Sequence, residues 1–194
     1  PPGVQTTAPI LDRTFGQGSG QGYIALAAGS IKNATDEPDS TIASAAQGAL
    51  SFTVTPGSPD PQVLILHTHA TETYQTWDTP VYDPDFTART KDTTLNMCAV
   101  GEAMTKVLND AGITTLHDTT LHDSPSYTES YARSAQTARR YLEEYPSIKV
   151  VLDVHRDAME SGDARVRPLT TLDGQPTAQV MIIAGCNNGG TVQL

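Results

Sequence analysis

Two histidines and a glutamate follow a short apolar segment in the first half of the chain. The segment reads Val63-Leu-Ile-Leu-His-Thr-His-Ala-Thr-Glu72. Four apolar residues that follow the turn-forming residues 56–61 predict a buried strand. His69 and Glu72 have the spacing of metal ligands, because an imidazole nitrogen and a carboxylate oxygen three residues apart on a turn can both reach one Zn²⁺.

A second apolar segment also ends in a histidine. It reads Val150-Val-Leu-Asp-Val-His155. Because ligands usually bind beyond the carboxyl ends of the strands in an open α/β sheet, we expect His155 to lie near His69 and Glu72. Three protein ligands with one open position are typical of a catalytic zinc site. The alternative interpretation is that both histidines are hydrogen-bonded structural residues.

Composition sets limits on the possible partners of the chain. Its 194 residues are enough for one domain with an appendage. Twelve basic and 22 acidic residues give a net charge of −10, which argues against nonspecific binding to nucleic acid or anionic lipid. No apolar run approaches the roughly 18 residues of a membrane span. The two cysteines, Cys98 and Cys186, are too few for a disulfide framework and either pair or stay buried.

The chain divides into three predicted segments. Residues 1–22 are rich in Pro, Gly and Thr and are predicted to be a flexible linker. Residues 23–60 form a lead-in segment, with short edge strands near 23–26 and 30–32 and helical turns within 41–50. Residues 61–194 form the main domain. Within it, the loop 73–91 carries aromatic residues that could line a substrate site or pin the loop to the core.

Two long helices are predicted in the main domain. The first begins at Asp92 as N-cap and ends before Gly112, with apolar residues at helical spacing. These are Leu95, Ala99, Ala103, Val107 and Ala111, joined by Val100, Met104 and Leu108. Asp92 either caps this helix or directs its carboxylate into the site. The second helix covers 126–145 and opens with a capping box formed by Ser126 and Glu129.

Strands and helices alternate along this domain. Besides the two segments that end in histidine, residues 113–117 and 179–184 are strand candidates. Strands alternating with long helices predict an α/β fold with a mostly parallel central sheet and helices on both faces.

A set of short motifs in a fixed order resembles the stage II sporulation protein P family. The motifs are His67-Thr-His-Ala-Thr-Glu-Thr-Tyr74, Arg89-Thr-x-Asp92, Asn96-x-x-Ala-Val-Gly101, His117-Asp118, His122-Asp123, Pro125-Ser-Tyr-x-x-Ser-Tyr131, Pro146-Ser-Ile-Lys149 and Asp153-x-His-Arg-Asp157. The resemblance extends from about Gly22 to Gly185.

This resemblance implies a zinc-dependent N-acetylmuramoyl-L-alanine amidase with the zinc-amidase, phosphorylase/hydrolase-like architecture. Such enzymes cleave the amide between muramic acid and L-alanine in peptidoglycan. The resemblance also implies degradation of the septal wall during engulfment, in partnership with the lytic transglycosylase stage II sporulation protein D. The protein is then expected to be extracytoplasmic at the sporulation septum, held to the membrane by an anchor that this chain lacks.

The wider zinc-amidase family supplies an expected set of ligands. Its members use a His after the first strand, a Glu at the start of the first long helix and a His after a later strand. His69 and His155 match the two histidines, with His67 as a near alternative to His69. The middle ligand is either Glu72, which we favour, or Asp92.

The wider family also has a catalytic Glu near its C-terminus, past one more strand. No acidic residue follows Gly185 here, so we expect either a C-terminally incomplete domain or missing internal residues. Glu160 is a weaker candidate for that role. Arg133 and Arg156 are candidates for binding substrate carboxylates, or else form internal salt bridges.

Two other functions remain open from the sequence. A wall-binding module that has lost catalysis would explain the absent C-terminal Glu. A zinc carboxypeptidase or endopeptidase on a related scaffold would also use the His-x-x-Glu spacing.

Overall fold

The computed structural model describes residues 8–27 and 29–184. Its chain divides into two compact units. Of the described residues, one unit comprises 52–79 and 83–158, and the other comprises 8–27, 29–51, 80–82 and 159–184. Each unit is described by itself below.

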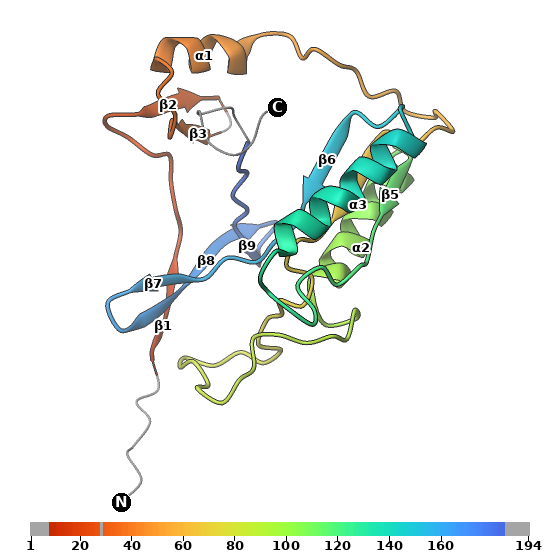
Figure 1. The fold of residues 1–194 in the computed structure, drawn as a ribbon. Coiled ribbons are helices and arrows are strands. Elements are labelled where there is room, and N and C mark those ends of the chain that lie inside the picture. The colour runs from red at the N-terminus through yellow and green to blue at the C-terminus, as the bar shows by residue number, and fades with distance from the viewer. Residues whose placement is uncertain (1–7, 28, 185–194) are drawn as a thin grey trace, which may run out of the picture. The chain divides into compact units, whose positions relative to one another are not determined.

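The first unit is built on a three-stranded parallel sheet (Figure 1). Strands β4 (Val63–Leu66), β5 (Thr115–His117) and β6 (Val150–Asp153) lie in the order β5-β4-β6. All four residues of the central strand β4 are buried. A continuous apolar strand is expected where both faces of a parallel sheet are covered. The predicted α/β class with a parallel sheet is therefore confirmed.

Helices α2 (Met97–Asp110) and α3 (Ser130–Glu144) connect these strands. The chain passes from β4 to β5 through α2, and from β5 across β4 to β6 through α3. Crossovers of this kind are almost always right-handed, so two that run in opposite directions along a sheet place their helices on opposite faces. Accordingly, Leu64 and Leu66 of β4 belong to a buried apolar cluster against which Ala138 and Tyr141 of α3 pack.

Helix α2 begins later than predicted. Its N-cap is Asn96, whose side chain accepts a hydrogen bond from the Cys98 amide. Asp92 instead accepts hydrogen bonds from the amide and hydroxyl of Thr94 in the turn before the helix. The predicted C-terminal stop is correct, because the helix ends at Asp110 and Gly112 has a φ of 80°.

The buried face of α2 also differs from the prediction. Val107 is 68% exposed and Leu95 is 51% exposed, so the apolar series that contains them faces outward. The buried residues of the helix are Met97, Cys98 and Gly101. A glycine suits this face because a Cβ at position 101 would lie only 2.5 Å from the Nε2 atoms of His67 and His117.

Helix α3 begins at Ser130 rather than within the predicted capping box. Glu129 is its N-cap residue, has a φ of 64° and makes no capping hydrogen bond through its side chain. The Ser126–Glu129 capping box is therefore wrong. The predicted end of the helix is close, since α3 stops at Glu144, before Pro146.

The second unit contains the remaining strands and one helix. Strand β1 (Ile10–Arg13) pairs in parallel with β8 (Ala164–Leu172), which pairs antiparallel with β7 (Met159–Ser161) and β9 (Gln175–Ala178). Strands β2 (Tyr23–Leu26) and β3 (Gly29–Lys32) form an antiparallel pair, and α1 covers Asp39–Gln47. The two edge strands and the helical turns of the lead-in are thus confirmed. Strand β1 lies within the range predicted as linker.

The predicted strand at 179–184 is wrong. These residues have no regular secondary structure, and Val180, Met181, Ile182 and Ile183 are each between 67% and 89% exposed. Hydrophobicity favours a strand only where neighbouring backbone can pair with it, and the part of the chain that the structure describes provides no partner here.

No helix among the described residues is long and apolar enough to cross a membrane. Cys98 is a buried free thiol. Cys186, and with it the question of a disulfide, lies outside the described residues, as does the C-terminal segment 185–194.

Candidate active site

The candidate site lies at the carboxyl ends of β4 and β6. In the sheet Leu66 pairs with Asp153, so the residues that follow each strand leave the same edge side by side. The chain runs from β4 to one neighbour and then crosses back to the other, which makes this edge a topological switch point. Open α/β sheets bind ligands at such points.

His69 and His155 come together at this edge, as predicted from their positions after the two strands. Their ring centroids are 5.1 Å apart and the rings are nearly perpendicular. Burial lowers the pKa of His69, and the nearby Glu72 carboxylate only partly offsets this effect. The neutral imidazole that burial favours is the form that binds metals.

Asp153 holds His155 through a hydrogen bond. Its Oδ2 lies 2.9 Å from Nε2 of His155. This hydrogen bond raises the pKa of His155, in spite of partial burial. Burial opposes ionisation of Asp153, yet hydrogen bonds from His155 and Thr68 bring the pKa of Asp153 below its ordinary value.

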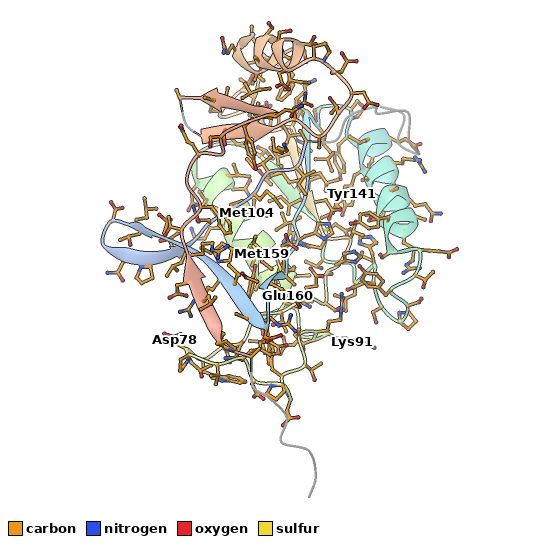
Figure 2. All side chains as sticks on the ribbon, turned by 90° about the vertical axis from the view of Figure 1, so that its left-hand side faces the viewer. Asp78, Lys91, Met104, Tyr141, Met159 and Glu160 are labelled. Atoms are coloured by element: carbon orange, nitrogen blue, oxygen red, sulfur yellow. The ribbon has the colours of Figure 1, made fainter. Side chains whose placement is uncertain are left out.

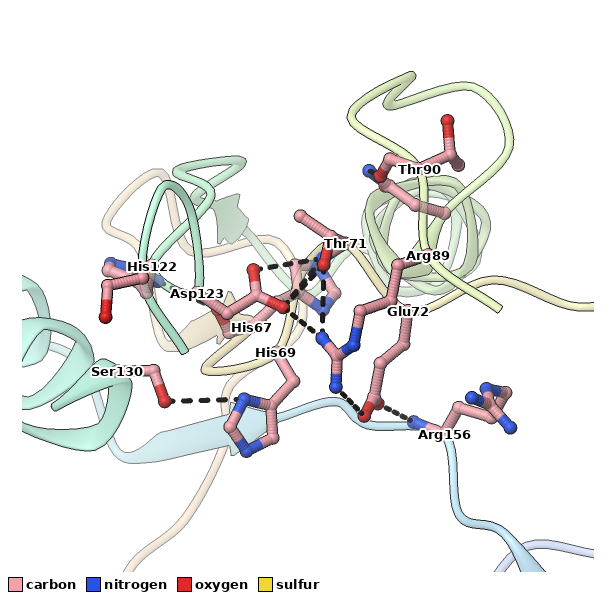
Figure 3. A network of polar contacts seen from close by, with 12 residues as sticks. His67, His69, Thr71, Glu72, Arg89, Thr90, His122, Asp123, Ser130 and Arg156 are labelled. Carbon is pink, nitrogen blue, oxygen red and sulfur yellow. Dashed lines mark hydrogen bonds and ion pairs between the residues drawn. The ribbon is translucent and has the colours of Figure 1, made fainter. Parts of the chain in front are cut away.

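Glu72 lies beside the two histidines, and its carboxylate interacts electrostatically with both. One oxygen accepts a hydrogen bond from the Arg156 amide at 3.1 Å, and the other lies 3.4 Å from the Arg89 guanidinium (Figure 3). Backbone pairing fixes this arrangement, because Glu72 and Arg89 are opposite residues of an antiparallel bridge.

Arg89 connects Glu72 to a second carboxylate. Its NH1 lies 2.6 Å from Oδ2 of Asp123, whose side chain is fully buried (Figure 3). Asp123 also accepts a hydrogen bond from the hydroxyl of Thr71. A buried carboxylate with these partners anchors the guanidinium, and the guanidinium in turn holds Glu72 at the site.

Two tyrosines border the histidines. The Tyr127 ring is stacked on His69 with centroids 4.4 Å apart, and Tyr131 contacts His69 and His155 at 5.2 and 6.1 Å. Both tyrosines remain more than half exposed. Burial also raises the pKa of Tyr131, so its hydroxyl keeps its proton at neutral pH. The site is therefore bordered by exposed aromatic rings beside the imidazoles.

His67 lies in a different environment from His69. Its Nδ1 donates to the carbonyl of Val154, and its Nε2 lies 2.9 Å from Nε2 of His117. Its side chain is completely buried. Both ring nitrogens are therefore occupied by protein partners, which marks His67 as a structural residue in this arrangement.

Two other residues that were predicted for the site, Asp92 and Arg133, have partners elsewhere in the structure. Asp92 is exposed, and no contact among the described residues links it to His69, Glu72 or His155. Arg133 donates hydrogen bonds to the carbonyls of His122 and Ser126. These hydrogen bonds hold the loop before α3 against the helix.

Arg156 and Glu160 differ in their position. Arg156 follows His155 directly, and its buried Nε has no hydrogen-bond partner among the described residues. Glu160 lies in β7 of the second unit, where it pairs with Arg165 (Figure 2). In the aromatic loop, Trp77 packs edge-on against Phe86, which is a contact within the loop itself.

Several residues of the site were not assigned a role from the sequence. These are Thr68, Asp123, Tyr127, Ser130, Tyr131 and Asp153, together with Arg89. All are polar or aromatic residues with at least one partner far away in the sequence. The Asp-x-His pattern at the end of β6 was the available signal, because a histidine that binds a metal commonly donates its second N–H to a carboxylate.

The donor types at the site fit Zn²⁺, although the residues that the structure describes contain no preformed cluster of three or more ligands. Two imidazoles and one carboxylate are a set typical of zinc hydrolases. Each of the three already has protein partners that could serve as supporting contacts.

These features define an α/β protein with a histidine-carboxylate site at the switch point of a parallel sheet. Comparison with known families gives a more specific result. The family model for stage II sporulation protein P matches residues 23–193, which is most of the chain. The chain belongs to the stage II sporulation protein P family.

The chain is also similar in sequence to one characterised member of this family. Stage II sporulation protein P of Bacillus subtilis (strain 168) is 27% identical over 129 residues, which cover 63% of this chain and 30% of that protein. The chain therefore matches less than a third of the length of this relative. No solved structure matches the chain.

Proposed function

We propose that the chain is a zinc-dependent N-acetylmuramoyl-L-alanine amidase that acts on peptidoglycan during sporulation. The observation that supports this most directly is the meeting of His69, Glu72 and His155 at the switch point, in a member of a sporulation family. A peptidoglycan hydrolase is consistent with this family. The amidase activity, the metal and the substrate are the proposal.

In this proposal His69, Glu72 and His155 hold the metal. A bound Zn²⁺ would polarise the substrate carbonyl and acidify water. Asp153 keeps the His155 ring in place through its 2.9 Å hydrogen bond. Arg89 keeps Glu72 at the site and, together with the Arg156 amide, satisfies its oxygens when no metal is present.

Two residues would then contact the substrate. Arg156 is one candidate, because its buried Nε lacks a hydrogen-bond partner among the described residues, while its NH1 lies 3.5 Å from the Asp157 carbonyl. We assign its guanidinium to a carboxylate of the stem peptide. Tyr131 lies against both imidazoles with a protonated hydroxyl, which can donate a hydrogen bond to the amide carbonyl. Arg133 is less suited to this role because carbonyls of the chain already occupy it.

The cellular part of the proposal follows from the family. We place the enzyme outside the cytoplasm at the sporulation septum, attached to the membrane through an anchor. There it would degrade septal wall in partnership with the lytic transglycosylase stage II sporulation protein D.

Product analysis tests the reaction. Purified sacculi are incubated with the zinc-loaded chain, and the released fragments are identified by mass spectrometry. An amidase releases intact stem peptides that begin with L-alanine and leaves the glycan strands uncut. Shortened stems would instead indicate a carboxypeptidase or endopeptidase, and binding without release would indicate a wall-binding module.

The matched control for this assay is Ser147→Ala, which removes a hydrogen bond to the Pro61 carbonyl at the opposite end of β4. The control should keep the activity of the wild type. Activity that persists after removal of zinc with a chelator would contradict the proposal.

A further inference from the structure

Helix α3 contributes two serines to the site from its first two turns. Ser130 and Ser134 are four residues apart, so they lie on the same face of the helix, and both are buried. Ser130 lies beside His69, whereas Ser134 reaches His155 through two other residues. One helix face is thus connected to both imidazoles.

The connection from Ser134 to His155 is continuous. Oγ of Ser134 lies 2.6 Å from Oγ1 of Thr68, which lies 2.6 Å from Oδ2 of Asp153. The same carboxylate oxygen lies 2.9 Å from Nε2 of His155. Asp153 is held further by the Thr68 amide, at 2.8 Å from its Oδ1.

The direction of these hydrogen bonds follows from the number of available protons. An ionised carboxylate only accepts, so Thr68 and His155 both donate to Asp153. A hydroxyl has one proton, so Thr68 must accept from Ser134. The competing acceptor for Ser134 is the Tyr131 carbonyl, which is farther away at 3.1 Å.

This direction determines which nitrogen of His155 is free. When the neutral ring carries its proton on Nε2, the lone pair is on Nδ1. No hydrogen bond from the described residues reaches that Nδ1 atom. The chain of hydrogen bonds from α3 therefore selects one of the two neutral tautomers.

Ser130 has the corresponding position at the other histidine. Its Oγ lies 3.4 Å from Nδ1 of His69 (Figure 3). Nε2 of His69 has no hydrogen-bond partner among the described residues. If the serine oxygen accepts the Nδ1 proton, the lone pair of His69 is on Nε2.

We propose that Ser134, Thr68 and Asp153 are positioning residues that fix the neutral His155 ring with its lone pair on Nδ1, and that Ser130 fixes the neutral His69 ring with its lone pair on Nε2. The consequence of this proposal for metal binding rests on the function proposed above. The selection of the tautomers is independent of that function, because it is a property of the metal-free protein.

The experiment measures the tautomers directly. Two-bond ¹H–¹⁵N correlation spectra of the metal-free chain, labelled at histidine, distinguish a ring protonated on Nε2 from one protonated on Nδ1. The hydrogen bond to Asp153 raises the pKa of His155, so the spectra are recorded at alkaline pH, where the ring is neutral. We expect this neutral ring to be protonated on Nε2 in the wild type. Thr68→Val and Asp153→Asn should give a mixture of tautomers, and Ser134→Ala should give a smaller shift in the same direction. Ser130→Ala should change the His69 signals alone.

Two controls separate positioning from folding. Thr68→Ser keeps the hydroxyl and should restore the wild-type spectrum, which a merely structural role for the side chain does not require. Ser147→Ala removes a comparable hydrogen bond at the other end of the sheet and should leave both histidines unchanged. If Asp153→Asn does not fold, Ser134→Ala still tests the inference, because it removes a single oxygen.

Zinc affinity gives the second readout. Loss of a supporting contact commonly weakens metal binding about 10–100-fold, and we expect Thr68→Val to fall in this range. A His155 tautomer that is unchanged in Ser134→Ala, Thr68→Val and Asp153→Asn would overturn the inference. Tautomers that shift as expected in a chain that binds no zinc would support the inference and contradict the proposed function instead.

Discussion

The two histidine pairs near the end of β4 have opposite surroundings. The ring centroids are almost equally far apart, at 5.2 Å for His67 and His117 and 5.1 Å for His69 and His155. In the first pair, the closed pair, the two Nε2 atoms lie 2.9 Å apart and protein groups occupy both nitrogens of His67. In the second pair, the open pair, the rings contact the exposed rings of Tyr127 and Tyr131, and each histidine has one nitrogen without a hydrogen-bond partner among the described residues. The open pair is therefore the one that a ligand can reach.

Removal of one histidine from the open pair should have the largest effect. We expect His155→Ala and His69→Ala each to lose stoichiometric zinc and hydrolysis, with a loss of affinity greater than the roughly 100-fold upper range for supporting residues. Elemental mass spectrometry gives the zinc content per chain. Full zinc occupancy in either variant would mean that the open pair is not the metal site.

The Cys98 thiol, on the helix that contacts His67 and His117, should be inaccessible to thiol reagents. Burial raises the pKa of the Cys98 thiol, in the first turn of α2, from its ordinary value of 9.0 to about 11. Below pH 9 the thiolate fraction in the folded chain is then about a hundredfold lower than in the unfolded chain, and the thiolate is the reactive form. In a Cys186→Ser background, a thiol reagent at pH 8 should react slowly until urea unfolds the protein. Rapid modification of the folded chain would show that Cys98 is accessible to solvent.

Crowding the buried pair should reduce stability without removing the metal. In Gly101→Ala the new Cβ would lie 2.5 Å from both facing Nε2 atoms, so the helix or the rings must move. Overpacking of this kind costs about 1–3 kcal/mol. Urea denaturation measures the loss, and zinc content should stay at the wild-type level. Gly16→Ala is the control, because no atom lies within 4 Å of the added Cβ.

A change to Arg89, which holds Glu72 in place, should have the smallest effect on zinc affinity. Arg89→Lys keeps the charge but loses the planar group that joins Glu72 to Asp123. We expect zinc affinity to fall about tenfold, the lower end of the range for supporting residues. Competition with a chromogenic chelator measures this. An affinity equal to that of the wild type would indicate that Glu72 is held by its backbone and the Arg156 amide alone.

The sequence predicted the open pair but not its supporting residues. His69 and His155 could be found because each follows an apolar strand, and strands of that kind align at one edge of a sheet. Thr68 and Asp153 became partners only through the pairing of Leu66 with Asp153, which sets the register of β4 and β6. No local pattern specifies that register.

The errors in the fold have similar physical causes. Asp92 has the right residue type for a helix N-cap, yet it forms a turn with Thr94, and Asn96 caps α2 instead. The apolar stripe of α2 was placed on the wrong face because Gly101, which hydropathy ranks low, allows the close approach to His67 and His117. Residues 179–184 have the composition of a strand but no strand to pair with in the described chain.

The pairing of β4 with β6 also has a consequence for the order of events in folding. Val63 pairs with Thr115 in β5, but its partner in β6 is Val150, much farther along the chain. Contacts between distant residues close large loops and tend to form late. His69 can therefore meet His155 only after most of this unit has been synthesised and folded. If His69 and His155 bind a metal as proposed, a newly made chain should gain this site only when β6 docks beside β4.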